Sequence, residues 1–250
     1  MPNTRRRLTV IGLLLCGMSG LSARAWAQAQ APQRAPLLEQ IAKTYGVDSW
    51  DKVEGIRYTW NAEITGLFKA SHKWEWEPKT GKVSFQGVGK DGKPVNVTYD
   101  SSQLGSQSDQ IKNEIEPAFI NDNYWALFPF HAYWDKSASA IDQGKFNLPM
   151  GPGTAELLPI KYPAEVGGFT PGDIWDLYVG KDNRVVYFVY HRGGARPPSR
   201  VFATWTGYKK AGPILFSTEH RGVADGKPLH ISLSDVAVKL TGSDKWMAAQ

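Results

Sequence analysis

The chain has 250 residues and a formal net charge of +5 at pH 7. Four of its 29 basic residues (Arg5, Arg6, Arg7 and Arg24) lie in a predicted export signal, so the rest carries 25 basic against 24 acidic residues, a net of +1. This balance argues against a nucleic-acid partner. The only cysteine, Cys16, lies in the same segment, which excludes a disulfide or a catalytic thiol from the mature chain.

Residues 1–27 have the layout of a signal peptide. A basic start precedes an apolar run over residues 10–21, and Ala25-Trp26-Ala27 matches a small-x-small cleavage site. The run is shorter than the about 20 residues that a membrane span needs, so we expect cleavage near Ala27 and no transmembrane segment in the mature chain. The expected location is periplasmic or secreted, and both the general secretory and the twin-arginine routes stay open.

The remaining chain, about 220 residues, suits a single domain. Residues 28–35 are polar and contain proline, which predicts a flexible lead-in. We expect the domain over residues 36–242 and a short tail over residues 243–250.

Apolar residues over 37–45 recur at helical spacing and predict a helix that ends at Gly46. After it, alternating apolar residues and turn signals predict strands over 56–64, 73–77, 83–85, 95–99, 155–162, 173–179, 184–191, 200–208, 214–220 and 229–240. In the last strand the apolar residues lie at odd positions up to Leu233 and at even positions from Val236. This change predicts a β-bulge near Ser234 and Asp235. The fold class is therefore mainly β: a strongly curved antiparallel sheet or unclosed β-barrel, covered by short helices.

The middle of the chain interrupts the strands. Residues 108–120 have helical character, although Pro117 indicates a break into two short pieces. Asn121, Asp122 and Asn123 are interpreted as a cap for the next segment. That segment, residues 119–135, reads FINDNYWALFPFHAYWD and holds seven aromatic residues in seventeen. They fit neither one helical stripe nor one strand face, so we expect this segment to cover the sheet and to meet apolar surface, or a ligand, on more than one side.

Aromatic side chains are the candidate ligand-binding residues. They come from the aromatic segment and from predicted strands: Trp60, Trp125, Phe128, Phe130, Trp134, Trp175, Tyr187 and Trp205. As a cavity wall they would hold an acyl chain or another apolar molecule. As a packed plug they would only anchor the segment on the sheet. Both interpretations stay open.

No residue pattern assigns catalysis or a metal. The five histidines have no histidine or cysteine partner at metal-ligand spacing, and no G-x-S-x-G motif is present. We therefore assign no catalytic residue, no metal ligand and no cofactor, and expect a binding protein rather than an enzyme.

Several segments together resemble the periplasmic lipoprotein-carrier group, the LolA-like proteins. They are the strand-turn-strand DIWDLYVGKDNRVVYFVYHRGG, the segment TWTGYKKAGPILFSTEHR and the final strand LHISLSDVAVKL, in an exported chain that opens with a helix. The resemblance covers residues 36–242. It implies an unclosed antiparallel barrel with helices over its concave side and, as in several members, an apolar cavity for acyl chains.

The expected function is an exported binding protein or carrier that holds a hydrophobic ligand, a lipid or acyl chain, in the concavity of the sheet. Envelope proteins are a further class of partner. One alternative is a secreted hydrolase of glycans or esters, whose site would join an acid of raised pKa to a histidine or a second carboxylate. Another is an envelope interaction module, which would have an exposed apolar patch and no pocket.

Overall fold

A computed structural model describes residues 32–165, 169, 171–193 and 199–250. The predicted signal peptide and its cleavage site lie outside the described residues. The described strands are β1 (Val53–Ile64), β2 (Phe68–Glu77), β3 (Lys82–Val88), β4 (Pro94–Asp100), β5 (Ser139–Ala140), β6 (Lys145–Asn147), β7 (Thr154–Lys161), β8 (Ile174–Val179), β9 (Val185–His191), β10 (Arg200–Thr204), β11 (Thr206–Ala211), β12 (Ile214–Ala224), β13 (Lys227–Leu240) and β14 (Trp246–Ala248).

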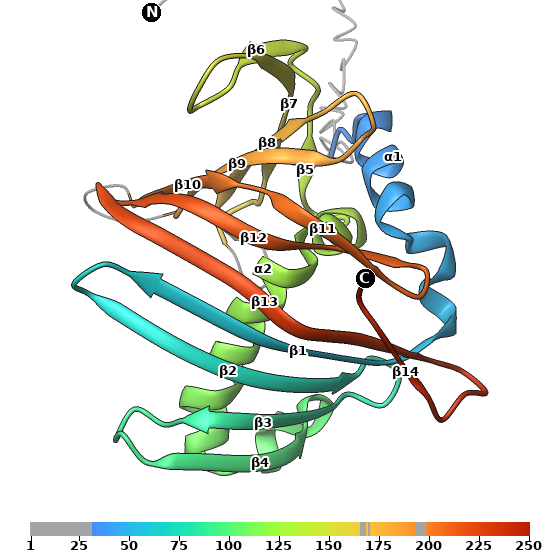
Figure 1. The fold of residues 1–250 in the computed structure, drawn as a ribbon, viewed down its shortest axis with the longest axis vertical. Helices are drawn as coiled ribbons and strands as arrows, with labels where there is room; N and C mark the ends of the chain where they lie inside the picture. The colour runs from blue at the N-terminus through green and yellow to red at the C-terminus, as the bar shows by residue number, and fades with distance from the viewer. Residues whose placement is uncertain (1–31, 166–168, 170, 194–198) are drawn as a thin grey trace, which may run out of the picture. The chain divides into compact units, whose positions relative to one another are not determined.

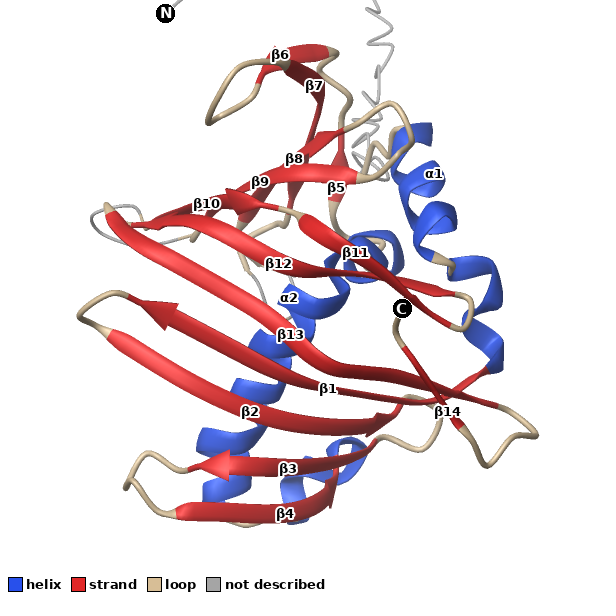
Figure 2. Ribbon diagram, in the orientation of Figure 1, coloured by secondary structure: helices blue, strands red, loops and turns tan. Residues whose placement is uncertain are grey.

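Within the described residues, these 14 strands form one antiparallel sheet. Its main path is β4-β3-β2-β1-β13-β12-β10-β9-β8-β7-β5, with β11, β14 and β6 paired beside it. The ends of this path are not paired with each other, so the sheet is open, and Figures 1 and 2 show how strongly it bends. The predicted fold class is confirmed. The predicted strand over 200–208 is divided into β10 and β11 at Trp205, whose N–H donates to the carbonyl of Val186.

The predicted bulge in the last long strand is confirmed. Arg57 of β1 pairs with Ala237 of β13, whereas Thr59 pairs with Ser234, so β13 holds one extra residue between these pairs. Asp235 lies there with φ +53°, a conformation that aspartate tolerates better than most residues. Its carboxylate accepts a hydrogen bond from Thr59 Oγ1 at 3.0 Å, which holds the bulge against β1.

The predicted N-terminal helix is α1 (Pro36–Tyr45), and it ends at Gly46 with φ +105°. It is followed by the short helix η1 (Val47–Lys52). The Tyr45 hydroxyl lies 2.6 Å from the Tyr208 hydroxyl and accepts from the N–H of Val185 at 3.3 Å. These bonds attach α1 to β9 and β11.

The second cover is α2 (Glu116–Trp134), which follows the short helix η2 (Ser101–Ser106) and the π-helical turn η3 (Ile111–Ile115). The expected break at Pro117 is wrong, because η3 continues into α2. Proline has no N–H for the carbonyl of Asn113, and Lys90 Nζ donates to that carbonyl instead, at 3.2 Å.

The interpretation of Asn121, Asp122 and Asn123 as a cap is also wrong, since all three lie inside α2. The backbone instead departs from helical geometry at Leu127 (φ −129°, ψ 24°). Pro129, two residues later, supplies no N–H for the carbonyl of Trp125, which accounts for the kink.

The aromatic residues of helix α2 do not form a single stripe, as the aromatic segment predicts. Residues 122–130 are buried without interruption. The rings reach distant parts of the sheet: Phe119 contacts Trp74 of β2, and Trp125 contacts Phe188 of β9. Figures 1 and 2 show α2 crossing behind the sheet from β3 to β12. Aromatic rings on more than one side of a helix need such cover.

Arg34, in the expected lead-in, anchors the end of α2. Its guanidinium donates to the carbonyl oxygens of Ala132 (3.0 Å), Tyr133 (2.6 Å), Asp135 (2.6 Å) and Ala138 (3.1 Å). The last carbonyl groups of a helix have no partner within it, so this side chain satisfies groups that burial would otherwise penalise.

The expected tail over residues 243–250 contains β14, which pairs with β13. Gln250 also exchanges backbone hydrogen bonds with Lys210. Among the described helices, none is long and apolar enough to cross a membrane.

Candidate functional site

Two adjoining cavities lie between α2 and the sheet, with volumes of about 820 and 390 Å³. Both are lined by Trp60, Ala62, Phe68, Pro117 and Asn121. We call the two together the α2 groove. Volumes in this range are those of small-molecule sites in proteins.

A pair of small side chains lies in the floor of the groove. Ala62 of β1 is directly opposite Ala70 of β2, whereas the rows on either side pair Trp60 with His72 and Ile64 with Phe68. Protein interiors are normally filled to crystal density, so two methyl groups between larger neighbours leave space beneath α2. The strand register therefore creates the volume.

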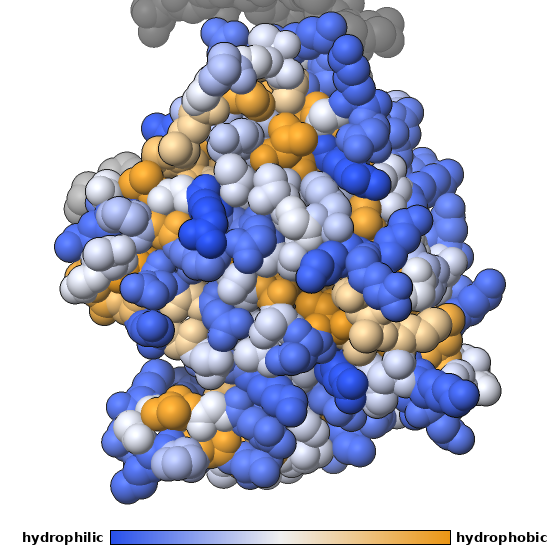
Figure 3. Space-filling model, in the orientation of Figure 1, coloured by the Kyte–Doolittle hydropathy of each residue, from blue (hydrophilic) through white to orange (hydrophobic). Residues whose placement is uncertain are grey.

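The larger cavity is open at one end, between two hairpin turns. Phe68, at the start of β2, is 46% exposed, and Val88, at the end of β3, is 60% exposed; both line the cavity. Lys90 and Glu114 lie at the same end. Figure 3 shows hydrophobic surface over the turn between β3 and β4. Apolar side chains therefore lie at this opening beside charged ones, which include Lys69, Lys90 and Glu114.

A buried polar pair faces the larger cavity. The Asp122 side chain, on α2, is only 1% exposed, and its Oδ2 lies 2.6 Å from Nδ1 of His72. The same oxygen accepts from Trp74 Nε1 at 2.8 Å, and Oδ1 accepts from Asn121 Nδ2 at 3.0 Å. Burial raises the pKa of the Asp122 carboxyl, while these hydrogen bonds act in the opposite direction.

His72 is held on its other side by packing. Its ring stacks on Trp60 with centroids 5.5 Å apart and planes 19° apart. Because Asp122 binds Nδ1, Nε2 is the nitrogen available to a bound molecule. The side chain is 15% exposed and lines the larger cavity.

Other buried polar pairs hold α2 in place. Tyr99 donates to Glu116 Oε2 at 2.6 Å, and burial raises the pKa of Glu116. His131 Nε2 lies 2.7 Å from Asn123 Oδ1, and burial lowers the pKa of His131 to about 3. None of these four residues lines either cavity.

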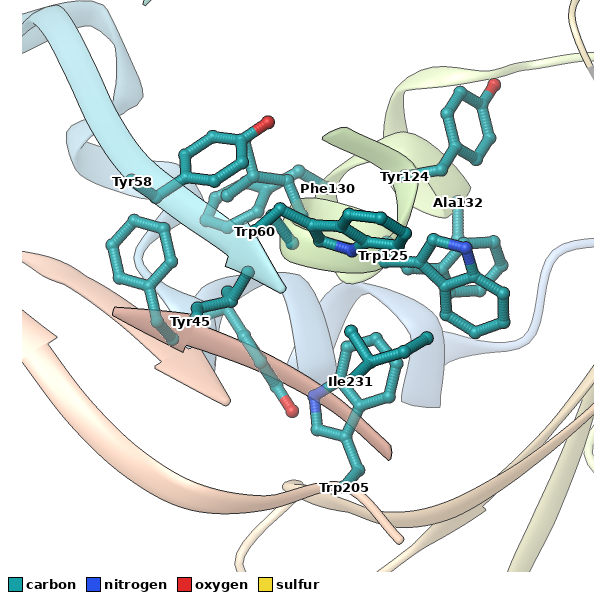
Figure 4. Close-up of a cluster of buried hydrophobic side chains, with 14 of the residues drawn as sticks. Tyr45, Tyr58, Trp60, Tyr124, Trp125, Phe130, Ala132, Trp205 and Ile231 are labelled. Carbon is teal, nitrogen blue, oxygen red and sulfur yellow. The ribbon is translucent and has the colours of Figure 1, made fainter. Parts of the chain in front are cut away.

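The structure brings three of the predicted site residues to the groove. Trp60 lines both cavities, and Trp125 and Trp175 line the smaller one. Figure 4 shows Trp60 pointing from β1 toward the helix that carries Trp125. These side chains could contact a bound ligand.

Phe128 and Phe130 are fully buried and line neither cavity. Phe128 stacks on Trp175 with centroids 4.0 Å apart, and Phe130 packs on Trp50 at 5.0 Å. In this half of α2 the aromatic segment is a packed plug.

The remaining predicted residues lie away from the groove. Trp134 packs on Trp50, and Trp205 packs on Phe188 and His220. Tyr187 precedes Phe188 in β9, so it points to the opposite face of the sheet.

Phe68, His72 and Asp122 were not predicted as site residues. A signal for His72 is present, because it alternates with Trp74 and Trp76 and so shares their inward face. No comparable signal marks Asp122, which pairs with a residue 50 positions away.

No family model matches the chain, and no curated protein matches it. Solved structures similar to it include a DUF1329 family protein from Desulfovibrio piger, at 14% identity and a TM-score of 0.45, which covers 83% of this chain and 94% of that one. A LolA superfamily protein from Nitrosomonas europaea has 7% identity and a TM-score of 0.44, covering 81% and 93%. The lipoprotein LppX from Mycobacterium tuberculosis has 8% identity and a TM-score of 0.28, covering 80% and 94%.

Proposed function

We propose that this protein is an exported binding protein or carrier that holds a hydrophobic ligand, a lipid or an acyl chain, in the α2 groove. The observation that carries the proposal is the open, mainly apolar space over Ala62 and Ala70 beneath a helix that is otherwise tightly packed. Export rests on residues 1–27, which predict a periplasmic or secreted protein after cleavage near Ala27.

The energetics favour an apolar ligand. Each methylene that leaves water for the groove contributes ~0.8 kcal/mol. The larger cavity has an open end with exposed apolar side chains, Phe68 and Val88, so a chain can slide in from a membrane or from a partner. Envelope proteins that deliver or receive the ligand are the partners that such a carrier needs.

The experiment is native mass spectrometry of the full chain, exported and purified from its host without detergent, followed by solvent extraction of the bound material. We expect a mass above that of the polypeptide and an extracted lipid or fatty acid. A protein that leaves its host without adduct, and that takes up no lipid from added vesicles, would contradict the proposal.

A hydrolase is the second candidate, because the His72–Asp122 pair joins an acid of raised pKa to a histidine inside a groove. An aspartate that orients a histidine is part of many hydrolytic sites. The hydrogen bond of His72 to a described residue is the one with Asp122, so a water molecule would be the nucleophile. The test is hydrolysis of p-nitrophenyl acyl esters and glycosides. Turnover that His72→Gln abolishes would favour the hydrolase, and equal background rates in both proteins would exclude it for these substrates.

A further inference from the structure

We propose that the His72–Asp122 pair makes the α2 groove selective for amphiphiles with a carboxylic acid headgroup, such as a long-chain fatty acid, with the carboxyl group bound at Nε2 of His72. This inference rests on the proposed function, since it names the ligand class of the same groove.

The pair is costly to keep inside an apolar interface. A carboxylate that is 1% exposed loses nearly all its hydration, and well-packed apolar residues commonly replace such pairs without loss of stability. Three donors, on His72, Trp74 and Asn121, compensate the Asp122 carboxylate. His72 lines the larger cavity, and its hydrogen bond to a described residue is the one that Nδ1 makes with Asp122, which leaves Nε2 for a ligand. A polar group of a bound ligand would be the hydrogen-bond partner of Nε2.

The proton arrangement selects the kind of group. Trp74 Nε1 is only a donor, so Asp122 Oδ2 accepts from it, and we place the proton between Oδ2 and His72 on Nδ1. Nε2 is then an acceptor when His72 is neutral and a donor when it is protonated. A carboxylic acid satisfies both states, because one proton lies between Nε2 and the carboxyl oxygen in either case. An ester matches only the protonated state, and a hydroxyl group is a weaker partner for it.

The position of His72 fits a headgroup site. Along the inward face of β2 the order from the open end is Phe68, Ala70, His72 and Trp74, and Trp74 is fully buried. His72 therefore lies where the larger cavity ends against packed side chains. A carboxyl group bound there leaves its chain against the apolar wall that both cavities share, which includes Trp60 and Ala62.

The test uses three probes of equal chain length: dodecanoic acid, methyl dodecanoate and dodecan-1-ol. Their affinities for the delipidated full chain are measured by calorimetry at pH 7. We expect the wild-type protein to bind the acid about tenfold more tightly than the ester, as one charge-assisted hydrogen bond predicts. His72→Phe keeps an aromatic ring against Trp60, and it should abolish this preference.

A cooperative urea unfolding transition is the folding control for His72→Phe. If that variant does not fold, His72→Gln serves in its place, because its amide can still donate to Asp122 but supplies no imidazole nitrogen to the ligand. Equal wild-type affinities for acid and ester would overturn this inference and leave the proposed function standing. An unchanged acid preference in the folded His72 variant would overturn it as well. Failure of the wild-type protein to bind any of the three probes would count against the proposed function itself.

Discussion

The two halves of α2 rest on different parts of the same sheet, and only one half covers a groove. The N-terminal half faces β1 and β2, where Ala62 and Ala70 leave space. The C-terminal half, which carries Phe128 and Phe130, meets large rings such as Trp175 and leaves none. Both halves carry buried aromatic rings, so aromatic content alone does not distinguish a wall from a plug. The size of the side chains on the opposing strands decides which one forms.

The packed half should carry the larger share of stability. Phe128→Ala removes a fully buried ring that stacks on Trp175, and we expect a loss of ~3–5 kcal/mol in the free energy of unfolding. Phe68→Ala, at the open end of the groove, is the matched control, and urea unfolding should give it a much smaller loss because its ring is 46% exposed. Equal losses in the two variants would contradict the division of α2 into a plug and a groove wall.

The anchor at the end of the packed half should have the next largest effect. Arg34→Met keeps the aliphatic part of the side chain but removes four hydrogen bonds to carbonyl oxygens around the end of α2. We expect unfolding to become easier by ~2–3 kcal/mol. Lys43→Met, which breaks an exposed ion pair with Glu39 on α1, is the control and should change stability little. An Arg34 variant as stable as this control would show that the contact is dispensable.

Acid should weaken the packed region through His220. The ring is fully buried against Trp205, and burial lowers its pKa from 6.5 to about 4. Below pH 6.5 the unfolded chain binds a proton that the folded chain does not bind until about pH 4. The stability from this residue is therefore complete above pH 6.5, and ~2 kcal/mol of it is lost between pH 7 and pH 5.

Urea unfolding at several pH values measures this effect. His220→Phe should show a smaller loss between pH 7 and pH 5 than the wild-type protein, whatever its stability at pH 7. Parallel pH profiles for the wild-type protein and His220→Phe would mean that His220 is already protonated in the folded state, or that it does not contribute.

Much of the sheet could be predicted from the sequence because strand periodicity is local. Alternation in β1 places Trp60 and Ala62 inward without knowledge of the partner strand, and the change of parity in β13 marks the bulge at Asp235. The groove could not be predicted in this way. It depends on the register that sets Ala62 opposite Ala70, and alternation within each strand does not give that register.

The polar residues of α2 were misjudged for a related physical reason. Three adjacent polar residues, Asn121, Asp122 and Asn123, are typical of a helix start when only near neighbours are considered. In the structure Asp122 and Asn123 are buried inside the helix, because His72 and His131 hydrogen-bond them there. The pairing of Asp122 with β2 spans 50 residues, and no local pattern reveals it.

The central claim is that the space over Ala62 and Ala70 holds an apolar ligand. Ala70→Phe places a ring in that space, and Lys73→Phe adds the same ring on the outer face of β2 as a matched control. Native mass spectrometry of the wild-type protein and both variants, after identical incubation with lipid vesicles, measures the bound fraction directly. We expect bound lipid in the wild-type protein and in Lys73→Phe, and a loss of most of it in a folded Ala70→Phe. Equal loading of all three proteins would contradict the claim.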